Sequence, residues 1–416
     1  MKIQEIYNQK KNNFLFSDSQ KFKELREDII QNFDLSLKNK KNNESIQNVD
    51  PIAFVSSYNY NNVSDDINYI NIDENNVNIQ VVDGKISKIE TNKDNKSKVI
   101  ISNIKNKNNL IHDKFLTYQN YFNQDLILNL NSLFLNSGYE ITISENEQAT
   151  IYISNNTKEK NSTIFQKNFI HCMKNSKVCI IEEYSSQILS NTNSVNFLNI
   201  DENANLKHYI IQRNAKKSPL QLTSYTNCKK NSQYKQSTIN IANSSIRNHH
   251  YANLLGENVH ADLDGIFFAS TDQIIDNKTH VNHNFPNSES NQCYKGILTD
   301  NAKASYLSKT FVDKIAQKTE AYQLSKGVLL SNESSFYSKP ELKIYADDVK
   351  CSHGSTIGPI DQDLLFYLRS RGLNKKQSIS LLIKSFFDNI VSNYDQKNVL
   401  KKFNYYSNIW LKQNNI

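Results

Sequence analysis

The sequence of 416 residues has little glycine, proline and cysteine: nine, five and five residues, respectively. No glycine belongs to a G-x-x-x-x-G-K-[ST] or G-x-G-x-x-G pattern, so the chain lacks both common glycine-rich phosphate loops. If the process it serves uses ATP, another chain must hydrolyse it. The cysteines are odd in number and scattered, unlike a disulfide framework. We therefore expect a reduced, cytoplasmic setting.

Long apolar runs are also missing. No segment approaches the roughly 20 apolar residues that a membrane-spanning helix needs. The first residues, MKIQEIYNQKKNNFLF, show neither an apolar h-region nor a small-residue cleavage pattern, so no secretory signal is predicted. The net charge of +7, from 49 basic and 42 acidic residues, is dispersed. Nucleic-acid binding usually shows a clustered basic face. We expect neither a membrane nor a nucleic acid as a partner.

Three regions differ in their sequence pattern. Residues 1–95 read as a helical and then irregular N-terminal region, in which Phe22, Leu25, Ile29 and Phe33 recur at helical spacing. Residues 96–355 are predicted to form an all-β core of short β-branched and aromatic runs separated by polar clusters, a pattern that is visible from about Asn76. Residues 356–416 are predicted to be a C-terminal helical domain.

A weak repeat occurs within the β region. Asn followed by a small or aliphatic residue recurs at Asn175, Asn203, Asn231 and Asn258, in steps of 28, 28 and 27 residues. A β-solenoid needs such a regular coil length, because each coil buries its apolar side on the next. Asparagine is so common in this chain that chance explains the spacing equally well, and both interpretations stay open here.

The C-terminal region carries clear helix signals. Asp361 is placed as an N-cap with Gly372 just past the helix end, and Asn374 can form a capping box with Gln377. The apolar residues from Ile379 to Ile390 then form a stripe wider than one neighbour need cover. As a cap, these helices would also protect the final edge of a β-solenoid.

The densest chemistry lies in IYADDVKCSHGST, residues 344–356. If this stretch is extended, Tyr345, Asp347, Val349, Cys351 and His353 face one way. The Cα atoms of the cysteine and the histidine are then about 6.5 Å apart, so a thiolate and an imidazole can converge on one ion. These are ligands for zinc or iron–sulfur chemistry, but two of them make only half of a four-coordinate site.

The remaining histidines and cysteines give weaker signals. His280 and His283 are three residues apart in a predicted strand, so they face opposite ways and share a metal poorly. Cys172, Cys179 and Cys228 read as core residues. A hydrolase with a cysteine nucleophile in the 351–353 triplet is disfavoured, because side chains two apart on a strand point in parallel rather than at each other.

The block KPELKIYADDVKCSHGSTIGPIDQDLLFYLRSRGL closely resembles the C-terminal signature of the SufB/SufD family of iron–sulfur cluster assembly subunits. Its Asp-Asp-x-x-Cys-Ser-His segment is similar to the SufD branch. The segments THVNHNFPNSESNQCYKGIL, AQKTEAYQLSKGVLLS and SISLLIKSFFDNIV agree, and the resemblance is strong over residues 276–391. One departure is Ser308, which stands where the family has a glycine in a strand turn.

This resemblance implies a mainly β fold, a right-handed parallel β-helix between N-terminal and C-terminal helical regions. It implies a non-catalytic scaffold subunit that assists iron acquisition and cluster assembly, pairs with SufB and docks the SufC ATPase on its C-terminal helices. Self-pairing in the absence of SufB, flavin binding by the assembled complex and the cluster type stay open. The alternative from another class is a secreted-type β-helix enzyme acting on polysaccharides, which would need clustered carboxylates in a groove.

The resemblance also assigns residues. A nascent cluster or iron would lie at the SufB interface, with His353 as the favoured ligand and Cys351 as either a ligand or a structural thiol. Asp347 and Asp348 would accept hydrogen bonds that orient the imidazole, or serve the turn at the strand end. The residues expected to contact SufC lie in the C-terminal helices: Arg369, Arg371, Gly372, Leu373, Leu382 and Phe386.

Overall fold

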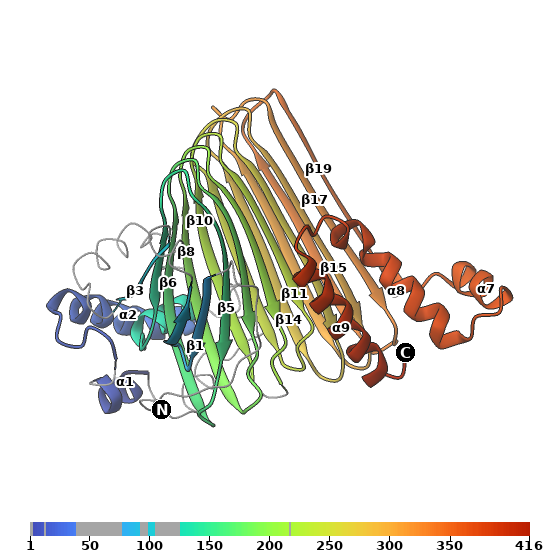
Figure 1. Ribbon diagram of the computed structural model, residues 1–416, viewed down its shortest axis with the longest axis horizontal. Coiled ribbons are helices and arrows are strands. Elements are labelled where there is room, and N and C mark those ends of the chain that lie inside the picture. The colour runs from blue at the N-terminus through green and yellow to red at the C-terminus, as the bar shows by residue number, and fades with distance from the viewer. Residues whose placement is uncertain (1–2, 12–13, 39–76, 92–98, 105–124, 216–217) are drawn as a thin grey trace.

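The computed structural model describes residues 3–11, 14–38, 77–91, 99–104, 125–215 and 218–416. Much of the irregular part predicted for the N-terminal region, residues 39–76, therefore lies outside the described residues. Within the described ranges the chain is mainly β, with helices near both ends (Figure 1). No helix among these residues combines the length and the apolar character needed to cross a bilayer.

Two long sheets dominate the structure. The ten-stranded sheet runs in the order β19-β17-β15-β13-β11-β9-β7-β5-β1-β2, and the nine-stranded sheet in the order β18-β16-β14-β12-β10-β8-β6-β4-β3. The strands of the ten-stranded sheet are β1 (Val77–Val82), β2 (Lys85–Glu90), β5 (Gln148–Asn156), β7 (Lys177–Tyr184), β9 (Asn205–Gln212), β11 (Gln233–Asn240), β13 (His260–Ala269), β15 (Glu289–Leu298), β17 (Thr319–Leu329) and β19 (Val349–Pro359). Those of the nine-stranded sheet are β3 (Val99–Asn103), β4 (Tyr139–Ile143), β6 (Ser162–Cys172), β8 (Ser190–Ile200), β10 (Leu220–Cys228), β12 (Ile246–Leu254), β14 (Ile274–His283), β16 (Lys303–Val312) and β18 (Ser335–Ile344).

From β5 onward the chain alternates between the two sheets, so each turn adds one parallel strand to each of them. The pairs β1–β2 and β3–β4 at the other end are antiparallel. Apolar residues such as Ile180, Leu206 and Leu263 fill the space between the sheets. This is a parallel β-solenoid, so the predicted fold class is confirmed. The division into domains at residues 95 and 355 stays a prediction.

The asparagine repeat marks the same corner of four successive coils. Asn175, Asn203, Asn231 and Asn258 have left-handed backbone conformations, with φ of 59°, 57°, 56° and 58°. Asparagine tolerates this region better than most side chains. Each side-chain amide donates to the side-chain oxygen of the asparagine one coil earlier, at 2.8 to 3.0 Å. The repeat is therefore structural, and the chance interpretation is wrong.

The N-terminal helices cover part of the outer face of the nine-stranded sheet. They are α1 (Ile3–Lys10), α2 (Gln20–Lys38) and α6 (Leu126–Leu133). Phe22 of α2 is fully buried and clusters with Phe169 and Phe197 of the sheet, while Phe33 packs with α6. The helical spacing read from the sequence thus marks the packed side of α2.

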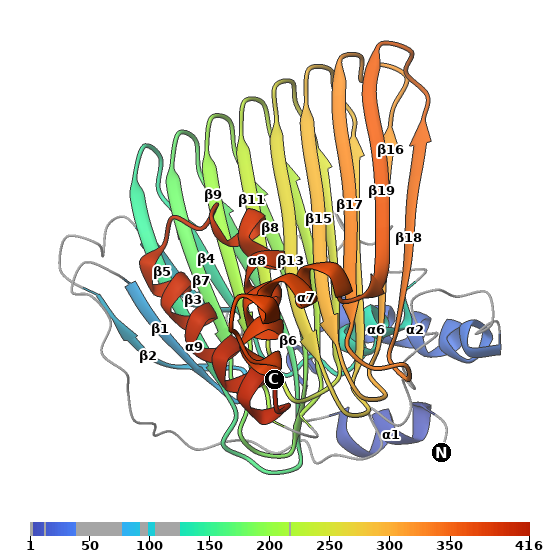
Figure 2. The same ribbon diagram turned by 90° about the vertical axis from the view of Figure 1, so that its right-hand side faces the viewer.

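The C-terminal helices are α7 (Gln362–Ser370), α8 (Lys375–Val391) and α9 (Lys397–Gln413). Their predicted caps are present: the Asp361 carboxylate accepts from two backbone amides, Gly372 has φ 94°, and Asn374 and Gln377 form a capping box. Helices α8 and α9 lie across the outer face of the ten-stranded sheet (Figure 2). Phe387, for example, contacts Phe268 of β13.

The expectation that these helices protect the final edge of the solenoid is therefore wrong. The outer face of the ten-stranded sheet is itself apolar, with Ile239, Phe268 and Ile297 in one cluster with Ile383 and Phe403 of the helices.

Candidate functional site

The last coil of the solenoid has two open strand edges. Within the described residues, β18 is hydrogen-bonded only to β16 and β19 only to β17. An unpaired edge presents backbone N–H and C=O groups that can accept a further strand. The densest chemistry of the sequence lies on one of these edges, because Cys351 and His353 belong to β19.

The register of β19 shows which way its side chains point. Cys351 pairs with Ala321 of β17, and His353 with Gln323. Both partners are buried inside the solenoid, and residues paired in a parallel ladder share a face. Cys351 and His353 thus face the solenoid interior at its open end, where no later coil of the described chain covers them. The predicted shared face of these two residues is confirmed.

The two side chains differ in their surroundings. Cys351 is half-buried and packs against a small apolar cluster of Val312, Ala316 and Ala346. Burial raises the pKa of its thiol above the ordinary value, so without a bound metal Cys351 stays protonated at neutral pH. His353 is exposed. Of the two, the imidazole is therefore the more accessible donor.

Asp347 and Asp348 are not on the strand. Strand β18 ends at Ile344 and β19 begins at Val349, so residues 345–348 form the connecting turn, and the expectation that Tyr345 and Asp347 share the strand face is wrong. The Asp348 amide donates to Gln317 Oε1 at 2.9 Å. Among the described residues, neither carboxylate hydrogen-bonds to His353, so the orienting role stays a prediction.

A buried polar residue lies directly beneath His353. The Gln323 amide nitrogen donates to Thr310 Oγ1 at 2.8 Å and to the Glu341 carbonyl at 3.2 Å, while its oxygen accepts from Ser308 Oγ at 3.2 Å. Ser308 therefore lies inside β16 and not in a turn as the family pattern suggested. Sequence reasoning missed Gln323, although its separation of one coil length from His353 could have indicated the pairing.

Among the described residues, Cys351 and His353 are the two candidate ligands on this strand. No group of three or more His, Cys, Asp or Glu side chains in the described part of the chain could hold a metal ion. A four-coordinate site at this end would need donors beyond these two residues.

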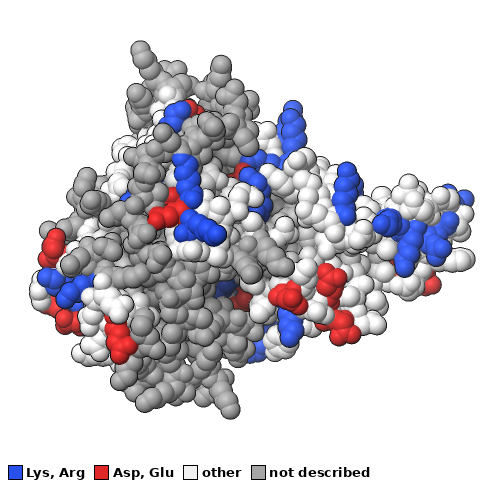
Figure 3. Space-filling view, turned by 90° about the horizontal axis from the view of Figure 1, so that it is seen from below, with Lys and Arg blue, Asp and Glu red and all other residues white. Residues whose placement is uncertain are grey.

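A second surface lies on α7, which extends away from the solenoid (Figure 1). Its apolar side chains Leu364, Phe366 and Tyr367 are 51%, 74% and 52% exposed. Arg369 and Arg371 are exposed beside them, and basic side chains gather at this end of the molecule (Figure 3). Gly372 is exposed as well, whereas Leu373 is half-buried.

A groove separates this helix from the solenoid. It has a volume of about 190 Å³ and is lined by Leu364 of α7, Leu382 and Phe386 of α8, and Ile297 and Val328 of the ten-stranded sheet. The rest of the predicted stripe is used differently, because Ile383, Phe387 and Ile390 are buried against the sheet. Most of the stripe thus serves internal packing, while Leu382, Ile383 and Phe386 also line the groove.

Comparison with known proteins identifies the family. The family model described as "SUF system FeS cluster assembly, SufBD core domain" matches residues 152–386. The chain is 33% identical to an iron–sulfur cluster assembly SufBD family protein of Synechocystis over 48% of the chain and 44% of the relative. It is 34% identical to the iron–sulfur cluster assembly protein SufD of Escherichia coli over 34% of the chain and 33% of that relative.

A third relative is the chloroplastic protein ABCI7 of Arabidopsis thaliana, which is 26% identical over 56% of the chain and 50% of the relative. The chain thus spans half or less of the length of these curated relatives. The family model, in contrast, covers more than half of the chain, including the strands from β6 to β19 and most of α8. The chain belongs to the SufBD family of iron–sulfur cluster assembly proteins.

Proposed function

We propose that this chain is a non-catalytic scaffold subunit that assists iron acquisition and de novo iron–sulfur cluster assembly, together with SufB and the SufC ATPase, in the cytoplasm. Family membership supports the process. The observation that carries the more specific role is the open solenoid end, where the edge strand β19 holds Cys351 and His353 facing inward.

The open end suits a partner of the same architecture. A second solenoid placed against it continues the ladder of β19 and covers the exposed interior residues, so it satisfies the free backbone groups and buries His353 at once. SufB is the proposed occupant. Pairing with a second copy of this chain is the competing outcome when SufB is missing.

Nascent cluster or iron is the cargo of this interface rather than a resident cofactor. His353 supplies a neutral imidazole, a ligand suited to iron, while SufB supplies the remaining donors. Cys351 can join only if it loses its proton, which the positive charge of a bound metal promotes. Its role as ligand or structural thiol stays open, as does flavin binding by the complex.

Helix α7 and the groove beside it are the proposed SufC site. The apolar side chains of α7 are exposed to solvent and would be buried by a partner, whereas those of α8 are mostly buried on the sheet already. Arg369 and Arg371 add charge at the edge of this surface. An ATPase belongs in the partner, since the sequence has no P-loop.

The first experiment replaces His353 by Ala in the chain co-expressed with SufB and SufC. The three proteins should still co-purify, because one exposed imidazole contributes little to a large interface, while cluster formation in the host falls. His260→Ala is the matched control, since His260 is a half-buried, accessible histidine on β13 away from the open end. Wild-type cluster formation in the His353 variant would refute the ligand role.

The second experiment tests α7. Removing the whole tail is unsuitable, because α8 and α9 cover the apolar face of the ten-stranded sheet. Phe366→Ser changes a side chain that is 74% exposed, and Tyr405→Ser on α9, 62% exposed, is the matched control. SufC should be lost from the complex only with Phe366→Ser. Retention of SufC by that variant would contradict the docking site.

The polysaccharide-active alternative gains no support. Its chemistry needs carboxylates gathered in a groove, whereas Asp347 and Asp348 lie exposed in the turn between β18 and β19.

A further inference from the structure

A small cavity lies in the first coils of the solenoid, at the corner where strands of the ten-stranded sheet end and the chain crosses to the nine-stranded sheet. This corner cavity has a volume of about 10 Å³ and is lined by β1, β5 and β7 on one side and by β6 and β8 on the other. The turns after β5, β7 and β9 complete the lining. Such a volume is about the smallest that holds a water molecule or a small ion.

Two buried asparagines of the lining have a side-chain oxygen without a partner. Asn155 and Asn214 are only 7% and 3% exposed, and Oδ1 of each is buried and accepts no hydrogen bond. Asn155 Nδ2 donates to Glu182 Oε1 at 3.3 Å, and Asn214 Nδ2 donates to the Ser218 carbonyl at 3.0 Å. These acceptors fix which amide atom is nitrogen and which is oxygen. An occupant is expected, because a buried carbonyl oxygen without a partner costs free energy.

Hydroxyl groups of the lining use their protons elsewhere. Ser185 Oγ donates to Asn156 Oδ1, and Ser186 Oγ donates to the Ile188 carbonyl at 2.9 Å. Both serines are buried residues of the lining, and their remaining lone pairs are available to the cavity. A water molecule accepts hydrogen bonds as well as donating them, whereas a cation needs only oxygen lone pairs. This set of oxygens therefore suits a cation better than a water molecule.

A buried carboxylate lies one hydrogen bond away from the cavity. Glu182 is fully buried and accepts from two lining residues, Asn155 and Tyr184, at 3.3 and 2.7 Å. His208 Nε2 lies 3.0 Å from its other oxygen, but the buried Nδ1 of that ring has no partner, so a second ring proton would lack an acceptor. None of the described Lys or Arg side chains forms an ion pair with Glu182. Its charge therefore makes the potential in the cavity negative.

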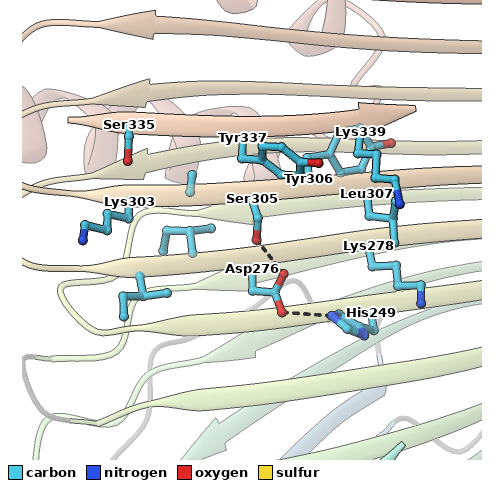
Figure 4. A pocket seen from close by; sticks show the side chains of 13 residues that line it. His249, Asp276, Lys278, Lys303, Ser305, Tyr306, Leu307, Ser335, Tyr337 and Lys339 are labelled. Atoms are coloured by element: carbon cyan, nitrogen blue, oxygen red, sulfur yellow. Dashed lines mark hydrogen bonds and ion pairs between the residues drawn. The ribbon is translucent and has the colours of Figure 1, made fainter. Parts of the chain in front are cut away.

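A larger concavity on the outer face of the nine-stranded sheet shows the contrast. Its carboxylate, Asp276, lies between His249 and Ser305, which contact Oδ2 and Oδ1 at 3.2 and 2.7 Å (Figure 4). The oxygens of Asp276 thus have partners from the protein itself. In the corner cavity, the oxygens of Asn155 and Asn214 have none, so their partner must come from solution.

We propose that the corner cavity binds one sodium ion through the neutral side-chain oxygens of Asn155, Asn214, Ser185 and Ser186. Neutral oxygens suit a monovalent cation, because calcium and magnesium sites usually include carboxylate ligands. The small volume favours sodium over the larger potassium ion. The four residues belong to the ends of β5, β7 and β9, so the ion connects three successive coils at the corner opposite the asparagine repeat.

Thermal unfolding of the full chain at pH 7 tests this, in sodium, potassium or choline chloride at about 0.2 M. An ion that binds only the folded state raises the midpoint of unfolding. A sodium concentration about twenty times Kd should raise it by about 2 °C relative to choline, and potassium should raise it less. Broadening of the sodium NMR line by the folded chain reports binding directly. Equal midpoints in sodium and potassium chloride would overturn the proposal, since a trapped water molecule and a general salt effect then explain the result.

Substitutions locate the ion. Ser186→Ala and Asn214→Ala each remove one proposed ligand and should reduce the sodium-dependent rise in the midpoint by about half or more. Asn277→Ala is the matched control, because Asn277 is a buried interior asparagine on β14 that accepts from Asn248 at 3.1 Å. The control should unfold at a lower temperature in every salt but keep the sodium-dependent rise. A rise of equal size in Asn214→Ala and Asn277→Ala would contradict the site.

Discussion

A buried ion pair connects helix α6 of the N-terminal helical region to the solenoid, and breaking it should markedly lower the free energy of unfolding. Arg247 of β12 donates to Asp125 Oδ2 at 2.6 Å, and the two side chains are only 2% and 6% exposed. Asp125 also caps α6, where Oδ1 accepts from the amides of Ile127 and Leu128 at 3.0 and 3.4 Å.

The burial of the pair sets the expected loss in the free energy of unfolding. Arg247→Met keeps most of the side-chain volume but leaves the Asp125 carboxylate buried without its cation. Removing one partner of a buried, hydrogen-bonded pair typically costs about 3–5 kcal/mol, mainly through the charge left behind. Asp125→Asn should cost less, because the amide oxygen still accepts from the helix amides and the negative charge of Asp276 still acts on the Arg247 guanidinium.

Urea unfolding of both single variants and the double variant measures this. The double variant should be more stable than the sum of the single losses predicts, with a coupling of about 2 kcal/mol or more. Lys230→Met is the control, since its pair with Glu257 is 53% and 46% exposed. If Arg247→Met unfolds at the same urea concentration as the wild type, the ion pair does not stabilise the fold and the prediction is wrong.

The same pair predicts acid sensitivity. Burial alone would raise the pKa of Asp125, but Arg247, with smaller contributions from His249 and Lys278, outweighs burial and the pKa is lowered. A carboxyl group whose pKa is depressed in the folded state contributes stability above its unfolded pKa of about 4, and this contribution is lost as the pH falls through the folded pKa. Arg247→Met should therefore flatten the decline of stability below pH 4.

Two further predictions follow from other parts of the solenoid. Asn203→Ala removes two ladder hydrogen bonds, to Asn175 and from Asn231, and places alanine at φ 57°. It should lower the free energy of unfolding by about 1–2 kcal/mol, and Asn203→Gly by less. Burial raises the pKa of Asp264 to about 7, so the folded state holds a proton that the unfolded chain releases near pH 4. The free energy of unfolding should therefore decline as the pH rises from about 4 to about 7. Asp264→Asn should remove that decline in thermal unfolding measured across this range.

The sequence allowed the local features to be predicted and left the packing partners open. The caps at Asp361 and Asn374 depend on residues within one helical turn, so the printed pattern contains all that is needed. The shared face of Cys351 and His353 follows from the strand period of two in the same way. The end of the strand was misjudged at Asp347, because nothing in that segment marks the turn by glycine or proline.

Long-range pairing could not be predicted. Arg247 and Asp125 are 122 positions apart, and no local period connects them. The apolar stripe of α8 predicted a buried face but not the surface that buries it. A signal was present in the strands, however: β7, KVCIIEEY, is apolar on both faces, since Ile180 faces the interior and Ile181 packs on the outer side. Strands of this kind predict a covering layer on each side.

The two edges of the open end are not equivalent, which bears on how a partner would attach. Pro340 lies in the middle of β18, and a proline cannot donate to a ladder, so prolines in sheets are found mainly on edge strands. In β19 the one proline is its last residue, Pro359, so the ladder from Val349 to Gly358 is complete. We therefore expect a partner strand to pair along β19 more fully than along β18.

Hydrogen exchange of the chain with and without SufB measures this difference. Amides of β19 should gain more protection on binding than amides of β18, because only β19 offers an unbroken run of donors and acceptors. Pro340→Ala should change the protection of β18 and leave that of β19 unaltered. Equal protection of both strands, or protection confined to β18, would contradict the reasoning, since a partner would then be held by side chains around the open end rather than by the backbone ladder that continues the solenoid.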